Sequence, residues 1–208
     1  MVTFDCEAIF WDFDGVIKDS VKVKSDAFGQ LFLPFGKEVL KKVRDHHKAN
    51  GGMSRFEKLP IYLEWSGEGL EQKIIDKYEK KFSQMVKQRV IDSGWVEGVL
   101  NYLENNYQRQ KFFLITATPQ QEIEKILSML NIKHFFKKVI GSPTEKGEAI
   151  KQLLYRYKIT PNQTIMIGDA ITDYNAATEN RVSFILRRTA FNKNLQEQLN
   201  CQMIKNFL

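Results

Sequence analysis

Six side chains that can handle a phosphate group or a metal ion each follow a short apolar stretch of this sequence. They are four carboxylates, one hydroxyl and one ammonium: Asp12, Asp14, Thr116, Lys146, Asp169 and Asp173. Two carboxylates about 4 Å apart repel each other by roughly 4 kcal/mol at an effective dielectric constant of 20, so a close group of them needs a cation. Mg²⁺ prefers such oxygen ligands, and no cysteine or histidine cluster favours zinc. A magnesium site beside a hydroxyl and an ammonium is suited to phosphoryl transfer.

The apolar stretches predict the strands that must position these groups. They cover residues 8–13, 112–115, 138–140, 164–167 and 182–186. Helical apolar spacing separates the later stretches, as over residues 123–130. This alternation predicts an α/β fold, a Rossmann-like parallel sheet with helices on both faces. Ligands of such sheets bind at the carboxyl ends of the strands, where the six side chains stand.

Residues 16–92 break the alternation. Their apolar residues recur at helical spacing, as in Phe28, Leu31 and Phe32, and no strand pattern intervenes. We therefore predict an α/β core domain of residues 1–15 and 93–208, with an inserted, all-helical cap domain of residues 16–92. The last stretch, residues 191–208, is typical of either a docked helix or an irregular tail.

The order of the motifs resembles that of the haloacid dehalogenase-like (HAD) hydrolase superfamily. Asp12-Phe13-Asp14-Gly15 matches its first motif, Thr116 its second, Lys146 its third and Gly168-Asp169-Ala170-Ile171-Thr172-Asp173 its fourth. The helical insertion resembles the C1-type cap of its phosphatase and β-phosphoglucomutase-like branch. The resemblance covers the whole core and implies the HAD fold.

The resemblance also implies a role for each residue. Asp12 would be the nucleophile that forms an aspartyl-phosphate, and Asp14 would be the general acid and base. Mg²⁺ would be held by Asp12, the backbone carbonyl of Asp14 and Asp169, with Asp173 as a ligand or directly behind the ligands. Thr116 and Lys146 would bind the phosphoryl oxygens. The residues agree with this, because Asp12 and Asp14 are two apart and share one face of an extended segment.

The turn Gly51-Gly52-Met53-Ser54-Arg55 is the main indication of substrate specificity. It is similar to a segment of β-phosphoglucomutase-like caps in which the arginine contacts a distant phosphate. Arg55 is therefore a candidate specificity residue. The resemblance implies a Mg²⁺-dependent phosphatase acting on a small phosphomonoester, such as a phosphosugar, and a phosphosugar mutase is the alternative. The Gly168-Asp169 pair favours the hydrolase, because mutases commonly carry Glu-Asp there.

Composition limits the remaining readings. The net charge of +6 raises the alternative of a nucleic-acid binder, but basic residues alternate with acidic ones and favour solvated helix faces. We therefore expect a small phosphorylated metabolite as partner, with no nucleic acid and no membrane. The absence of an apparent signal peptide and the presence of only two cysteines indicate a cytoplasmic protein. We also expect a monomer or a homodimer. His46, His47 and His134 receive no role.

Overall fold

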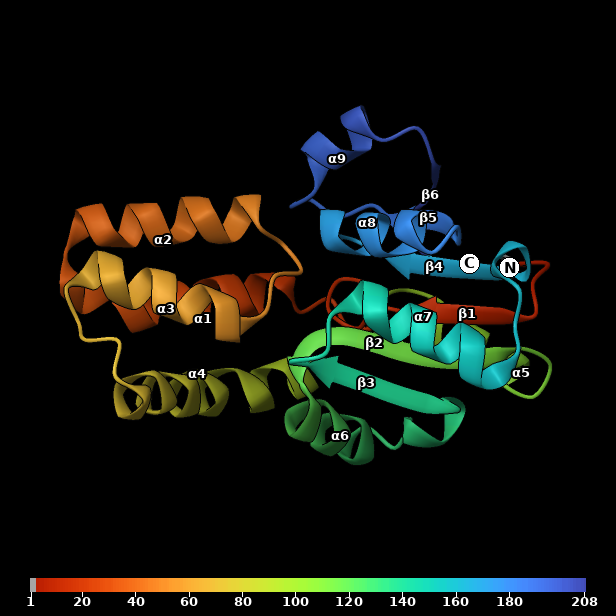
Figure 1. The fold of residues 1–208 in the computed structure, drawn as a ribbon, viewed down its shortest axis with the longest axis horizontal. Coiled ribbons are helices and arrows are strands. Elements are labelled where there is room, and N and C mark those ends of the chain that lie inside the picture. The colour runs from red at the N-terminus through yellow and green to blue at the C-terminus, as the bar shows by residue number, and fades with distance from the viewer. Residues whose placement is uncertain (1–2) are drawn as a thin grey trace.

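A parallel β-sheet forms the centre of the computed structural model, which describes residues 3–208. Within these residues the sheet has six strands in the order β3-β2-β1-β4-β5-β6 (Figure 1). They are β1 Ala8–Trp11, β2 Lys111–Pro119, β3 Lys138–Ser142, β4 Thr164–Gly168, β5 Ser183–Arg187 and β6 Gln202–Ile204. The first strand pairs in parallel with both β2 and β4, so it lies inside the sheet. The predicted fold class is confirmed.

Helices cover both faces of the sheet because the strands are apolar on both sides. Ile9 and Trp11 point toward the face that packs on α5 and α6, whereas Ala8 and Phe10 point toward α7 and α8. The core helices are α5 Val99–Asn106, α6 Gln120–Met129, α7 Lys146–Tyr157, α8 Ile171–Glu179 and α9 Lys193–Gln198. Short 3₁₀ turns occupy Leu33–Phe35, Lys133–Phe135 and Pro161–Gln163. Each large apolar side chain buried in this way contributes about 1.5–3 kcal/mol.

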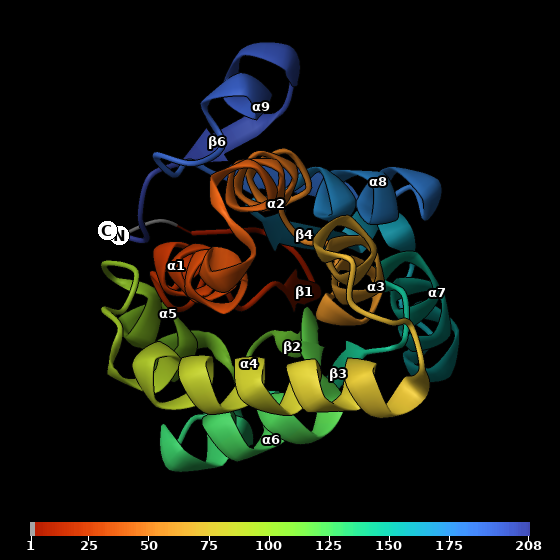
Figure 2. The ribbon, with the colours of Figure 1, turned by 90° about the vertical axis from the view of Figure 1, so that its left-hand side faces the viewer.

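Four further helices lie beside the carboxyl ends of the strands, and Figure 2 shows them in front of the sheet. They are α1 Val21–Phe32, α2 Lys37–Ala49, α3 Arg55–Ser66 and α4 Gln72–Asp92. They share a buried aromatic centre in which Phe28 lies 4.1 Å from Phe82 between ring centroids. No strand interrupts residues 21–92, in agreement with the helical insertion predicted there. The exact domain boundaries at residues 15/16 and 92/93 remain a prediction.

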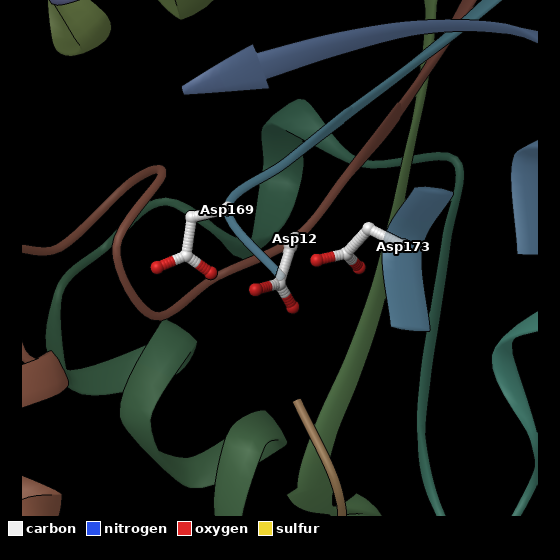
Figure 3. A group of neighbouring side chains, drawn as sticks. All are labelled: Asp12, Asp169 and Asp173. Atoms are coloured by element: carbon white, nitrogen blue, oxygen red, sulfur yellow. The ribbon is translucent and has the colours of Figure 1, made fainter. Parts of the chain in front are cut away.

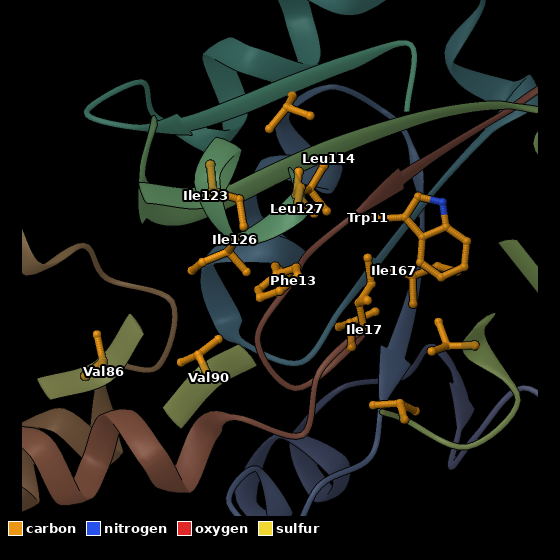
Figure 4. Packing of buried hydrophobic residues seen from close by; sticks show 14 of the residues in the cluster. Trp11, Phe13, Ile17, Val86, Val90, Leu114, Ile123, Ile126, Leu127 and Ile167 are labelled. Carbon is orange, nitrogen blue, oxygen red and sulfur yellow. The ribbon is translucent and has the colours of Figure 1, made fainter. Parts of the chain in front are cut away.

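The helical layer is packed directly on the α/β layer through α4 and α6. Val86 and Val90 of α4 lie in the same buried cluster as Ile123 and Ile126 of α6, as Figure 4 shows. Phe13, which directly follows the first motif's Asp12, is also buried in this cluster. The loop that carries the candidate nucleophile is therefore anchored between the two layers.

The end of the chain adds an edge strand to the sheet. For residues 191–208 the sequence was typical of either a docked helix or an irregular tail. The structure contains the short helix α9 followed by a three-residue strand, β6, which pairs in parallel with β5. The ring of Phe207 then packs 5.4 Å from that of Trp11. None of the helices within residues 3–208 combines the length and apolarity needed to cross a bilayer.

Candidate active site

The chain turns sharply directly after β1, and this turn presents both carboxylates of the first motif. The Asp12 N–H donates to the carbonyl of Ile167 at 3.0 Å, which continues the sheet pairing for one residue beyond the strand. Gly15 follows with φ of 81°, and a Cβ there would lie 2.2 Å from Oδ2 of Asp169. Only glycine fits both the left-handed backbone and the close approach. The loop after β1 is thereby held against the loop after β4.

Three carboxylates from separate parts of the chain meet at this edge of the sheet (Figure 3). Asp12 follows β1, Asp169 follows β4, and Asp173 lies in the first turn of α8. One carboxylate oxygen of each lies within 4.8 Å of the others. The parallel topology brings the three together because all these strands end at the same edge.

Lys146, at the start of α7, is the ammonium of this cluster. Its Nζ donates to Oδ1 of Asp12 at 2.9 Å and also to Oδ1 of Asp173. Burial alone would lower the pKa of Lys146, but the two carboxylates outweigh it and raise that pKa above its usual range. The other oxygen of Asp173 accepts the N–H of Ala170 at 3.1 Å. Both Asp173 oxygens are thus engaged by the protein, which suits a residue that orients Lys146 and the Asp169 loop.

One ammonium does not neutralise three carboxylates. Burial raises the pKa of Asp12 to about 7, with Lys146 opposing the shift and Asp173 adding to it. Burial, followed by the charges of Asp12 and Asp173, raises the pKa of Asp169 well above its usual value. The Asp169 carboxylate also accepts no hydrogen bond within residues 3–208. The hydrogen bond that Asp169 accepts there goes to its main-chain carbonyl, from Nδ2 of Asn192. A divalent cation between Asp12 and Asp169 would relieve this repulsion, so the donor set fits Mg²⁺.

Asp14 has different surroundings, and the sequence indicated none of its partners. Its Oδ1 accepts the Ser20 hydroxyl at 2.6 Å, and its Oδ2 accepts the Thr118 hydroxyl at 3.2 Å and the Lys24 ammonium. Burial alone would raise the pKa of Asp14, but Lys24, together with the two hydroxyls, lowers it. The spacing of Thr116 and Thr118 along β2 was the available signal, because alternate strand residues share a face.

A single cavity of about 900 Å³ joins these groups to the helical layer. Asp12, Asp14, Thr116, Lys146 and Asp169 line it, whereas Asp173 lies behind the wall. Thr116 is buried, and its hydroxyl accepts the N–H of Thr118 at 3.2 Å. The structure therefore brings the core residues indicated by the sequence into one site, five in its wall and one behind it.

Arg55 also lines the cavity, but its guanidinium is already paired. Nη1 donates to Oε2 of Glu122 at 2.9 Å, Nη2 donates to Oε1 at 2.5 Å, and Ser83 donates to the same carboxylate. The side chains of Arg55 and Glu122 are 5% and 8% exposed, so the pair is buried where α3, α4 and α6 meet. Sequence analysis missed Glu122, which reads as an ordinary acidic residue in the first turn of a helix.

The fold and this cluster define a class of protein, and comparison with known proteins identifies it: the chain belongs to the haloacid dehalogenase-like hydrolase family, whose sequence model matches residues 9–186. A phosphorylated carbohydrates phosphatase of Thermotoga maritima is 25% identical over 82% of this chain and 80% of its own length. A phosphoglycolate phosphatase of Psychrobacter arcticus is 28% identical over 81% of this chain and 77% of its own length.

Solved structures show the same fold. CbbY from Rhodobacter sphaeroides, crystallised in complex with phosphate, superposes with a TM-score of 0.77 over 97% of this chain and 95% of that chain. The two sequences are 12% identical, so the likeness is one of architecture.

Proposed function

We propose that this protein is a Mg²⁺-dependent phosphatase that hydrolyses a small phosphomonoester through a covalent intermediate on Asp12. The observation that carries the proposal is the meeting of Asp12, Asp169 and Lys146 in one cavity large enough for a metabolite. The relatives named as phosphatases, which match about four fifths of the chain, support the same class of reaction.

The proposed metal ligands are Asp12, the backbone carbonyl of Asp14 and Asp169. Asp173 lies directly behind them and holds Lys146. When bound, Mg²⁺ supplies positive charge for the phosphoryl oxygens and keeps the crowded carboxylates ionised. Thr116 and Lys146 are positioned to donate to the remaining phosphoryl oxygens, where the fixed Lys146 ammonium offsets the charge of the transition state.

In the first step, a carboxylate oxygen of Asp12 attacks phosphorus while the bond from phosphorus to the leaving oxygen breaks. Asp14 gives its proton to that leaving oxygen. In the second step, Asp14 takes a proton from a water molecule that attacks the phosphorus, and the Asp12 carboxylate is released with inorganic phosphate. Lys24, Ser20 and Thr118 hold Asp14 in place and favour its ionised form, which the second step requires. The first step proceeds from the smaller, protonated fraction of Asp14.

The mutase alternative finds no support at the residue that suggested it. The resemblance assigned the distant phosphate of a bisphosphosugar to Arg55, but the Arg55 guanidinium is already bound by Glu122. We therefore propose that Arg55 affects specificity through the shape of the cavity wall and not through direct contact with the substrate. The expected cytoplasmic location and the monomeric or dimeric state remain predictions.

A phosphate-release assay over a panel of phosphorylated metabolites, with Mg²⁺ or EDTA, tests the proposal. We expect Mg²⁺-dependent release by the wild type, and none by Asp12→Asn, which cannot form the acyl phosphate. Asp76→Asn, which alters an exposed carboxylate on α4, is the matched control and should retain full activity. An acid-quenched reaction should yield a phosphorylated peptide containing Asp12, and undiminished turnover by Asp12→Asn would refute the mechanism.

A further inference from the structure

The cavity extends from the core carboxylates into the helical layer, where its wall is basic. Cationic side chains from α1, α2 and α3 line this part: Lys24, Arg44, Lys48, Arg55 and Lys58. Among the lining residues on these three helices within residues 3–208, Asp45 is the one with a carboxylate. Its Oδ2 already pairs with Nζ of Lys41 at 3.2 Å. Because Arg55 is paired with Glu122 and Lys24 with Asp14, the positive potential at this end of the cavity comes from Arg44, Lys48 and Lys58.

Lys58 is the least expected of these cations. The residue is 2% exposed, and its Nζ lies 5.9 Å from the centroid of the Phe28 ring. Its hydrogen-bond partner within residues 3–208 is Nδ1 of His47, at 3.1 Å, and no carboxylate of that part of the chain pairs with it. Taking an ammonium out of water costs several kcal/mol unless an anion compensates. Burial, together with the charge of Lys24, lowers the pKa of Lys58 to about 7.

His47 offers a second donor beside Lys58. Burial, followed by the charges of Lys58 and Lys24, lowers the pKa of His47 to about 3, so the imidazole is neutral at pH 7. Because Nδ1 accepts from the Lys58 ammonium, the ring proton lies on Nε2. No protein group within residues 3–208 receives that N–H, and the residue lines the cavity. An ammonium and an imidazole N–H therefore stand together without an anion.

We propose that Lys58 and His47 bind a second anionic group of the substrate, a carboxylate or a second phosphate carried by the leaving part of the molecule. This inference rests on the proposed function, because it assumes that the phosphoryl group occupies the other end of the cavity, at Asp12. The substrate class is then the phosphomonoesters of hydroxy acids and sugar acids, or bisphosphates, rather than neutral sugar phosphates. A charge-assisted contact of this kind discriminates by about 10- to 100-fold.

The test compares substrates that share a carbon chain and differ in one group. At six carbons, 6-phosphogluconate is compared with sorbitol 6-phosphate, and fructose 1,6-bisphosphate with fructose 6-phosphate. At three carbons, 3-phosphoglycerate is compared with glycerol 3-phosphate. Dissociation constants are measured by calorimetry with Mg²⁺ on Asp12→Asn protein, which binds without turning over. We expect an acid or the bisphosphate to bind about 10- to 100-fold more tightly than its neutral counterpart. If the acids bind more tightly than the bisphosphate, the second anionic group of the substrate is a carboxylate, and in the opposite case it is a phosphate.

The variants assign that preference to Lys58. Lys58→Met in the same background should abolish it, whereas Lys58→Arg, which keeps the charge, should preserve most of it. Lys37→Met removes one exposed lysine of α2 that does not line the cavity, and it should leave the preference unchanged. Equal affinities for the matched substrates at both chain lengths, or a preference that survives Lys58→Met, would overturn the inference.

The two proposals fail in different ways. Phosphate release without any preference for anionic substrates would leave the phosphatase standing and remove the anion site. A preference in binding with no phosphate release from any substrate would remove the phosphatase and leave the anion site.

Discussion

The guanidinium of Arg55 and the carboxylate of Glu122 form a two-point ion pair that joins α3 of the helical layer to α6 of the α/β layer. The residues are 67 positions apart in sequence, and both side chains are almost completely buried. Ser83 on α4 donates to the same carboxylate, so three helices converge on one charge. The pair therefore holds the wall of the cavity in place, and the arginine is a structural anchor as well as a wall residue.

Removing one partner of this pair should destabilise the protein strongly. Glu122→Ala leaves the Arg55 guanidinium buried and unpaired, so we expect a loss of about 3–5 kcal/mol in the free energy of unfolding, measured by urea denaturation. The double variant Arg55→Met, Glu122→Leu removes both charges and should recover most of that loss. If the single and double variants were equally unstable, the cost would come from packing rather than from the charge.

Magnesium affinity should depend on pH near neutrality. Because the pKa of Asp12 lies at about 7 in the metal-free site, this carboxyl takes up a proton as the pH falls below 7, and a protonated carboxyl cannot bind the ion. We expect the dissociation constant of Mg²⁺ to rise by about fivefold between pH 7 and pH 6, measured by calorimetry at constant ionic strength. Affinity that stays constant from pH 8 to pH 6 would mean that Asp12 remains ionised without the metal.

The ionisation of Asp14 should respond to Lys24. The Lys24 ammonium stabilises the ionised carboxylate, so replacing it in Lys24→Met raises the pKa of Asp14. The step in the kcat profile that reports Asp14 should move to higher pH, whether the acid or the base form limits turnover. Lys22→Met, which alters an exposed lysine on the same helix, is the control. Superimposable profiles for Lys24→Met and the wild type would show that another group controls the titration.

The buried ammonium of Lys58 should cost stability in the absence of substrate. Its pKa is lowered from 10.5 to about 7, so between these values the unfolded chain binds more protons and stability rises with pH. The penalty is complete below pH 7 and disappears toward pH 10.5. Lys58→Met removes it, and we expect the variant to melt at a higher temperature than the wild type at pH 6, with a smaller difference at pH 9.5. A variant that is less stable than the wild type at both pH values would indicate a structural role for Lys58.

The sequence predicts the α/β layer and the core residues of the site because both depend on local patterns. Strands such as Ala8–Trp11 are short and apolar, and β1 to β4 carry functional residues at or after their carboxyl ends. The parallel topology gathers those residues at one edge of the sheet. Asp12 and Asp169 meet for this reason, although 157 positions separate them in the sequence. The helices of residues 21–92 are equally predictable from their apolar spacing.

The contacts between layers could not be predicted in this way. The burial of Lys58 and its contact with His47 depend on how α3 packs against α2. A lysine within a helix is ordinarily exposed to solvent, so the sequence gives no sign of this burial. The partners of Asp14 and the pairing of Arg55 with Glu122 likewise arise where two elements meet. Strand β6 escapes prediction because its three residues form a strand only by pairing with β5.

The central position of β1 has a consequence for how the chain is made. Ala8 pairs with Lys111 on one side and Thr164 on the other, so β1 is synthesised about 100 residues before its first neighbour in the sheet. At a synthesis rate of 5–20 residues per second, Ile9, Phe10 and Trp11 remain without partners for roughly 5–20 s. Nascent chains therefore expose an aggregation-prone apolar segment during this interval. The yield of active enzyme should depend on chaperones that bind this segment until β2 emerges.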